Sequence, residues 1–458
     1  MRRLSSTSYR RLTHRPQHGG VTNLPSTPPL SDPHLPAFEG MLGDGAVGTL
    51  ATALGLGAVR KARRSHVTWR PGRSAEVRFH ALVETHGGLR RLDLVAATGD
   101  RIEGVPVPRV HLPHAPGSDG CEEVAVWKVP RDPLLPGLRA ALDPEAVRDL
   151  LEQAGVLRAP VHLRMRAYRP LRRAVVEART GDHRLFLKVV PPAEVAALQE
   201  RHATIASHIA APASHGWSAQ HGILLLAAVP GHDLRTTIVR GDTLPSPEDL
   251  QALLAALPAL NDGRRARSGL RTALGHLRML RALAPEDASL LDALERGLRA
   301  VPPSDALVPV HGDFHSGQVL VEDGRITGLL DLDTVGMGEP VGDSATMIAQ
   351  FATSMALAAP EEQPSLRAYA KRLLRNAEGL HHPDLLGAHV AANVLGLATG
   401  PFRVQMDGWQ AETRRRLHLA AAWVHRAGIE VSLRSAGMAL DENSLMPLSG
   451  GSYAAESA

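Results

Sequence analysis

Residues 311–333, HGDFHSGQVLVEDGRITGLLDLD, place acidic and amide side chains around a short turn. Asp323 and Gly324 lie between the apolar runs VLV and ITGLL, which predicts a two-residue type I′ hairpin. In such a hairpin Glu322 pairs with Arg325. The segment therefore predicts two short antiparallel strands whose open end carries most of the polar side chains.

Three oxygen-bearing side chains are expected at that open end. Counting outward from the turn, Gln318 lies opposite Leu329, and Asp331 follows on the same face at a diagonal distance of about 7–8 Å. Asp313 lies in the loop that leads into the first strand. Carboxylate and amide oxygens are the ligands that Mg²⁺ prefers, so the pattern predicts a site for phosphoryl transfer.

The same segment resembles a known family. HGDFHSGQ resembles the catalytic loop H-G-D-x-x-x-x-N of aminoglycoside phosphotransferases and related small-molecule kinases, and LLDLDTVGMGEPVGD resembles the metal-binding segment that follows it. The resemblance implies that Asp313 accepts a hydroxyl proton and that Gln318 replaces the usual Asn. It implies Asp331 as the principal metal ligand, with Asp333 as a further ligand, and a structural role for Asp343.

Two other metal chemistries fit less well. His311 and His315 are four residues apart, but a zinc pair at this spacing needs a helix, and the intervening glycine favours a loop. Asp313 and His315 also resemble the Asp-x-His of dinuclear metallophosphoesterases. The downstream motifs of that class are missing, because Gly342-Asp343 is followed by Ser-Ala-Thr.

A nucleotide-binding lobe is expected before this segment. Lys188, in the apolar strand pattern RLFLKVV, is the candidate that pairs with ATP phosphates. A helix is predicted from Pro192 to Ile209, and Glu200 on it is expected to orient the lysine, with Glu194 as the alternative. The resemblance thus implies ATP and Mg²⁺ as cofactors.

The remaining nucleotide contacts are expected on two strands. The hairpin YRPLRRAVVEA lacks the glycines of typical kinases, so Arg172 and Arg173 are candidates for charge-assisted phosphate contacts. The strand GILLLAAVPGHDL would end in the hinge that binds adenine through backbone groups at Ala228 and Val229. Because Gln318 and the missing glycines depart from the family pattern, a pseudokinase that binds nucleotide as a regulatory module stays open.

The predicted fold is α+β and bilobal, protein-kinase-like, with a small β-rich N-lobe and a mainly helical C-lobe behind an N-terminal α+β cap domain. The predicted divisions are a disordered tail (1–40), the cap (41–150), the N-lobe (151–231), the C-lobe with the catalytic hairpin (232–436) and a mobile tail (437–458). Apolar residues at helical spacing predict C-lobe helices at 246–261, 269–282, 285–300, 342–357, 363–377, 383–398 and 409–427.

The cap carries a hint of internal repetition, and it resembles the N-terminal extensions of some actinobacterial phosphotransferases and maltokinases. Trp69-Arg-Pro-Gly-Arg is similar to Tyr168-Arg-Pro-Leu-Arg, and Trp127-Lys-Val-Pro is similar to Leu187-Lys-Val-Val-Pro. These echoes favour a cap built like a second copy of the nucleotide lobe.

Composition limits the remaining possibilities. The chain has 458 residues, 44% of them apolar, and a net charge of +4 without a dense basic block, so nucleic-acid binding is not expected. A single cysteine, Cys121, favours a reducing cytoplasm, and no apolar run suggests a membrane span. The expected partner is a small hydroxylated substrate (an aminoglycoside, a sugar or an amino alcohol). Arg403, Asp407 and Trp409 are candidate pocket residues, with packing as the favoured role of Trp409. The oligomeric state is left open.

Overall fold

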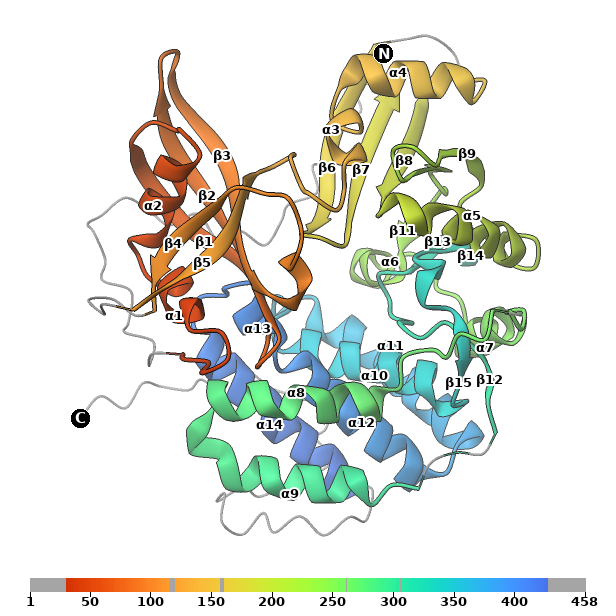
Figure 1. Cartoon of the computed structure of the whole chain (residues 1–458). Coiled ribbons are helices and arrows are strands. Elements are labelled where there is room, and N and C mark those ends of the chain that lie inside the picture. The colour runs from red at the N-terminus through yellow and green to blue at the C-terminus, as the bar shows by residue number, and fades with distance from the viewer. Residues whose placement is uncertain are drawn as a thin grey trace.

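The computed structural model describes residues 30–114, 120–156, 160–260, 262–302, 304 and 306–426. Two five-stranded antiparallel sheets lie next to each other above a layer of helices (Figure 1). The predicted α+β class is confirmed, as is the order of a β-rich N-lobe followed by a helical C-lobe.

The first sheet forms the cap and has the strand order β1-β2-β3-β5-β4. Two helices pack on it, α1 (Ala37–Leu42) and α2 (Ala46–Ala53). Its strands are β1 (Val59–Arg70), β2 (Ser74–Thr85), β3 (Gly88–Gly99), β4 (Arg109–Pro113) and β5 (Cys121–Lys128).

The second sheet belongs to the N-lobe and repeats this order as β6-β7-β8-β10-β9. It follows two helices, α3 (Gly137–Ala140) and α4 (Pro144–Gln153), and α5 (Pro192–Ala206) is inserted after β8. Its strands are β6 (Val161–Arg169), β7 (Arg173–Thr180), β8 (His183–Val189), β9 (Ser214–Ser218) and β10 (Ile223–Ala227).

The repeat extends to individual hydrogen bonds. In the cap, the Asp32 carboxylate accepts from Trp69 Nε1 at 2.9 Å and from the Gly72 amide at 2.7 Å. In the N-lobe, the Asp132 carboxylate accepts from the hydroxyl of Tyr168 at 2.7 Å and from the Leu171 amide at 2.8 Å. The first of the two predicted echoes is therefore a structural repeat.

The second sequence similarity, between the segments at Trp127 and Leu187, does not correspond to equivalent positions in the two sheets. Trp127 lies on β5, whereas Leu187 lies on β8, and the strand orders make β5 equivalent to β10 rather than to β8. The cap residue in the position of Lys188 is Ala97, because Glu76 pairs with Ala97 as Val175 pairs with Lys188.

The cap joins both lobes through its two faces. On one face, Trp127 packs in a core shared with the second sheet, and its Nε1 donates to the Tyr168 hydroxyl at 3.0 Å. On the other face, the cap core includes Phe402 and Trp409 from the C-lobe, whose rings meet edge to face. Trp409 therefore packs in the core and is not a pocket residue.

Most of the seven predicted C-lobe helices begin and end within about three residues of the predicted positions, because each carries an apolar face and several carry a cap. Ser246 and Asp249, for example, form a capping box at the start of α7. The helices are α6 (Leu234–Arg240), α7 (Pro247–Ala255), α8 (Gly269–Leu283), α9 (Ala288–Arg299), α10 (Val341–Met355), α11 (Gln363–Leu380), α12 (Pro383–Leu397), α13 (Gly400–Arg403) and α14 (Trp409–Arg426). The helix predicted at 246–261 ends at Ala255, and α6 and α13 were not predicted.

Part of the N-terminal segment is folded, contrary to expectation. Residues 30–40 were expected to be disordered, but they include most of α1 and bury Leu35 and Phe38 in the cap core, whose apolar surface they cover. The expected tails at 1–29 and 437–458 lie outside the described residues. The stretch Pro383–Arg403 is long and apolar enough to cross a membrane, yet most of it is buried inside the protein, as in a core helix.

Candidate functional site

The predicted hairpin is formed by β13 (Val319–Glu322) and β14 (Arg325–Leu329), with Glu322 paired to Arg325. Asp323 and Gly324 have φ angles of 50° and 77°, as a type I′ turn requires.

The predicted register is wrong by one residue beyond the turn. A bulge at Thr327, whose hydroxyl donates to the Pro230 carbonyl at 2.7 Å, shifts the pairing so that Val319 lies opposite Leu329. The Leu330 amide consequently donates to the Gln318 carbonyl at 2.8 Å.

Asp331 and Asp333 are held by two cations from the N-lobe. Lys188 Nζ lies 3.0 Å from Asp331 Oδ1 and 2.6 Å from Asp333 Oδ1. Arg173 donates to both oxygens of Asp331 at 3.1 Å and to Asp333 Oδ2 at 3.2 Å. These four residues, named here the ion cluster, bring strands β7 and β8 against the segment that follows the catalytic hairpin.

The ion cluster fixes the charge of Asp331. Burial would raise the pKa of its carboxyl, but Lys188 and Arg173 hold that pKa well below the ordinary value. Conversely, burial would lower the pKa of Arg173, and the two carboxylates raise it. Asp331 also has a left-handed backbone, with φ 56° and ψ 52°, a conformation that costs energy for a residue other than glycine and is often found at functional sites.

The catalytic loop is anchored from behind by Asp343. This buried carboxylate accepts from the His311 amide at 2.6 Å and from the Gly312 amide at 2.9 Å. His311 is also buried; its Nε2 donates to the Leu330 carbonyl at 2.9 Å, and its Nδ1 accepts from the Asp313 amide at 3.3 Å. Asp343 and His311 therefore position the backbone that carries Asp313.

Asp313 itself is half-buried, and it lies within electrostatic range of Arg173, Arg169 and Arg403. Gln318 follows on the same loop, where its side-chain amide lies 3.3 Å from His315 Nε2. His315 Nδ1 accepts from the Gly317 amide, and the atom of Gln318 next to His315 Nε2 is its side-chain nitrogen, so the imidazole lies beside the amide that carries the candidate ligand oxygen.

The donor set fits a hard cation. The Lys188 ammonium marks a point at which oxygens of Asp331 and Asp333 converge, and Gln318 could add an amide oxygen. In the described part of the chain, no group of three or more His, Cys, Asp or Glu side chains forms a metal site. A magnesium site here would therefore depend on two carboxylates and an amide.

Other expected nucleotide contacts are only partly brought together. Glu200 is exposed on α5, and the recorded ion pairs of Lys188 are with Asp331 and Asp333. The structure therefore does not support Glu200 as the residue that orients Lys188, because the phase of the helix turns it outward. The other candidate on the helix, Glu194, is exposed as well.

The predicted arginines and hinge residues lie near the ion cluster. Arg173 belongs to it, whereas the Nε of Arg172 is buried without a hydrogen-bond partner. Ala228 and Val229 follow β10, and the Ala228 amide already donates to the Arg184 carbonyl at 3.0 Å. An adenine ring bound at this hinge would need hydrogen bonds from the other backbone groups of the segment.

Three further arginines, which the sequence did not point to as a group, lie within electrostatic range of one another: Arg169, Arg267 and Arg403. Arg169 and Arg403 are also within range of Asp313. Arg169 ends β6, Arg267 precedes the N-cap of α8, and Arg403 ends α13. They come from segments about a hundred or more residues apart, so only the fold brings them together. We name them the arginine cluster.

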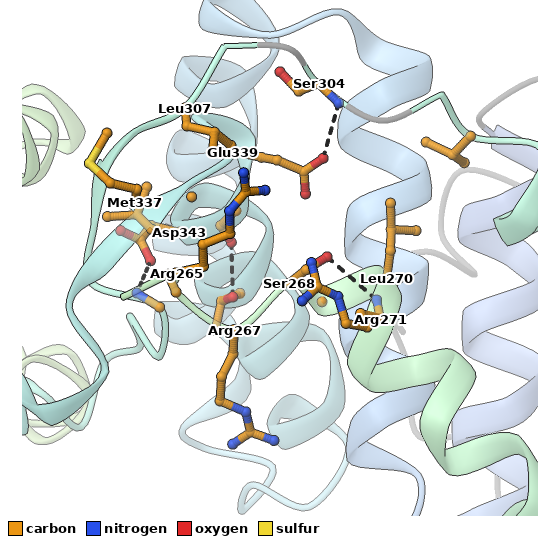
Figure 2. A pocket seen from close by; sticks show the side chains of 18 of the residues that line it. Arg265, Arg267, Ser268, Leu270, Arg271, Ser304, Leu307, Met337, Glu339 and Asp343 are labelled. Carbon is orange, nitrogen blue, oxygen red and sulfur yellow. Dashed lines mark hydrogen bonds between the residues drawn. The ribbon is translucent and has the colours of Figure 1, made fainter. Parts of the chain in front are cut away.

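A cavity of about 570 Å³ lies behind the catalytic loop (Figure 2). Its lining includes Gly312, Asp343 and Arg267, but not Asp313. Figure 2 shows the Arg267 guanidinium directed away from Arg265. The cavity therefore adjoins the catalytic loop without being the catalytic pocket itself.

Comparison with known proteins gives one family match. Residues 171–380 match the model of the phosphotransferase enzyme family, APH. The matched segment includes the N-lobe strands β7 and β8, the catalytic loop and the ion cluster. No curated protein sequence matches the chain.

Several solved structures are similar in part. Macrolide 2'-phosphotransferase from Brachybacterium faecium has 21% identity and a TM-score of 0.35, over 60% of this chain and 98% of that one. A thermostable mutant of aminoglycoside phosphotransferase APH(4)-Ia, in complex with ADP and hygromycin B, has 16% identity and a TM-score of 0.41, over 62% of this chain and 100% of that one. An aminoglycoside-3'-phosphotransferase of type VIII has 20% identity and a TM-score of 0.37, over 54% and 98%.

Proposed function

Because residues 171–380 match the model of the phosphotransferase enzyme family, we propose that this protein transfers the γ-phosphoryl group of ATP to a hydroxyl group of a small molecule. The observation that carries the proposal is the ion cluster next to Asp313. It unites a lysine, an arginine and two carboxylates from both lobes at one point. A cytoplasmic location, expected from the single cysteine, is part of the proposal.

The chemistry assigned to the residues is positioning and charge neutralisation. Asp313 orients the acceptor hydroxyl and takes its proton as the hydroxyl oxygen forms a bond to the γ-phosphorus. The bond from that phosphorus to the bridging oxygen breaks, and ADP leaves. Lys188 and Arg173, which pair with the carboxylates in the free protein, are available to contact phosphate oxygens when nucleotide binds.

Asp331, Asp333 and Gln318 are the residues that would hold Mg²⁺. When bound, the ion would neutralise charge on the phosphates. The convergence of two carboxylates on one ammonium supports this assignment. Asp331 and Asp333 have to exchange their contacts with Lys188 for contacts with the ion, so nucleotide and metal are expected to bind together.

The test uses the full-length protein and measures ADP release from ATP with a panel of hydroxylated acceptors. We expect Asp313→Asn to lower kcat by about 10²-fold or more, as for a general base, while the Kd for Mg·ATP changes little. Asp384→Asn, an exposed substitution on α12, is the matched control. Equal loss of turnover and nucleotide binding would contradict the role of Asp313, and a lack of Mg·ATP binding by the unmodified protein would refute the proposal.

A further inference from the structure

Within the part of the chain that the structure describes, no ion pair or side-chain hydrogen bond is recorded for Arg169, Arg267 or Arg403. All three side chains are exposed to solvent. Arg403 lies within electrostatic range of both other arginines and of Asp313. The guanidiniums therefore repel one another, and their positive charge is available to a ligand.

The charges of the site do not balance around this cluster. Lys188 and Arg173 are matched by Asp331 and Asp333 in the ion cluster. Asp313 lies within electrostatic range of Arg169 and Arg403.

Arg267 lines a cavity with Asp343 and Glu339, whereas the carboxylates that act on Arg169 and Arg403 are Asp313 and the already paired Asp331. Around Arg169 and Arg403, guanidiniums therefore outnumber the carboxylates left to balance them. Neighbouring guanidiniums on different segments are well suited to carboxylate and phosphate groups, which a guanidinium binds with two parallel hydrogen bonds.

The cap also contributes a residue next to the arginine cluster. His66, on β1, lies within electrostatic range of Arg403 and Arg169, and α13 contacts β1. Burial, with Arg403 and Arg169 acting in the same direction, lowers the pKa of His66 to about 4. The imidazole is therefore neutral at physiological pH and adds no positive charge beside the two guanidiniums.

We propose that the phosphoryl acceptor of this protein is an anionic hydroxylated metabolite, whose carboxylate or phosphate group binds Arg169, Arg267 and Arg403 while its hydroxyl group faces Asp313. The inference rests on the proposed phosphotransferase function. It excludes aminoglycosides as preferred acceptors, because their protonated amines would meet an excess of positive charge. Amino alcohols are disfavoured for the same reason, which leaves sugar acids, sugar phosphates and similar compounds.

The test is calorimetry of the full-length protein with Mg·ADP present, using four related probes. These are glucose, the cationic glucosamine, and the anionic glucuronate and glucose 6-phosphate. We expect at least one anionic probe to bind about tenfold or more tightly than glucose, and glucosamine to bind more weakly than glucose. This advantage should fall as salt is added. Comparing the two anionic probes distinguishes a carboxylate from a phosphate as the preferred group.

Variants connect the binding to the cluster. Arg403→Gln and Arg267→Gln should each weaken the anionic probe by about tenfold or more, the value of one charge-assisted hydrogen bond. Arg403→Lys should retain part of the affinity. Arg296→Gln, an exposed change on α9, should have no effect.

The proposal is overturned if neither anionic probe binds better than glucose, if glucosamine binds best, or if the two glutamine variants bind the anionic probe as tightly as the unmodified protein. Binding of Mg·ATP is measured separately. Its absence would refute the phosphotransferase function, whereas its presence without a preference for anions would refute only the acceptor class.

Discussion

Substitution of Asp343 by Asn tests how the catalytic loop is held in place. The carboxylate is 2% exposed and accepts two backbone hydrogen bonds, at 2.6 and 2.9 Å, from consecutive residues just before Asp313. An Asn side chain has one oxygen and one amino group in the same positions. It can accept one of these bonds, while its amino group would face the other backbone N–H.

The expected cost follows from these two contacts. A hydrogen bond to a charged acceptor contributes about 1.5–3 kcal/mol, and a buried N–H left without an acceptor costs about 1–3 kcal/mol. Burial raises the pKa of Asp343, and the backbone amides and His311 counteract that effect. The neutral Asn avoids part of the cost of burying a charge, so we expect a net destabilisation of about 2–4 kcal/mol. A displaced loop should also lower kcat by about 10²-fold, as a misplacement of roughly 1 Å does.

Thermal unfolding followed by circular dichroism measures the first effect, and ADP release at a temperature well below both melting points measures the second. Asp384→Asn, which alters an exposed carboxylate on α12, controls for loss of charge and should change stability by less than about 0.5 kcal/mol. If Asp343→Asn melts and turns over like the unmodified protein, the loop does not depend on this anchor.

Three further predictions concern the metal site and the response to pH. Asp331→Asn should abolish the Mg²⁺ dependence of ATP binding in calorimetry. The pKa of Asp331 is depressed in the folded state, so the contribution of its charge to stability is present above about pH 4 and is lost as pH falls below that value. The stability of Asp331→Asn should therefore fall less steeply with pH in this range. An unchanged acid-unfolding profile would contradict the ion cluster. Gln318→Asn, which shortens the side chain that contacts His315, should weaken Mg²⁺ by about tenfold without abolishing ADP release; a rise of activity from zero would instead indicate that the natural site is a pseudokinase. His66 has a pKa of about 4 in the folded protein, so stability should fall as pH drops from about 6.5 to 4, by up to about 3 kcal/mol, and His66→Gln should remove that loss in pH-dependent urea unfolding.

Local patterns predicted the local structure well. The turn at Asp323 and Gly324 requires two positive φ angles, which this dipeptide supplies, and the structure has them. The C-lobe helices follow from apolar spacing and from caps such as Ser246. The register beyond the turn failed because Thr327 bonds to Pro230, almost a hundred residues earlier in the chain, and that contact leaves no local trace.

The candidate site was predictable as a set of residues but not as a network. The resemblance supplied Lys188 and Asp331, and the fold brings them to 3.0 Å. It did not show that Asp331 pairs with the lysine in the free protein; Glu200 was expected in that role because it was chosen by spacing along a helix whose rotation was unknown. The arginine cluster was invisible for the same reason. Arg403 alone was a candidate, and its neighbours are set by how the cap packs on the C-lobe.

A repeated sequence segment indicates the duplicated sheet. Asp-Pro-x-Leu-Pro occurs at residues 32–36 and again at 132–136, a hundred residues apart. In both places the aspartate carboxylate accepts a hydrogen bond from a backbone amide in the turn between the first two strands of a sheet. A search for repeats of about this length would have predicted the duplicated sheet and placed residues 30–40 inside the folded cap.

The two copies of the sheet can be compared position by position, which separates structural residues from residues found only in the N-lobe. By strand register, Ser74 stands in the cap where Arg173 stands in the N-lobe, and Ala97 stands where Lys188 stands. The aspartate that shapes the first turn is kept in both copies, whereas neither cation is. Residues retained in both halves thus serve architecture, and those found in the second half alone are the ones to examine for phosphate binding. Exchanging such positions between the halves would transplant the cationic pair onto a scaffold that already has the same backbone.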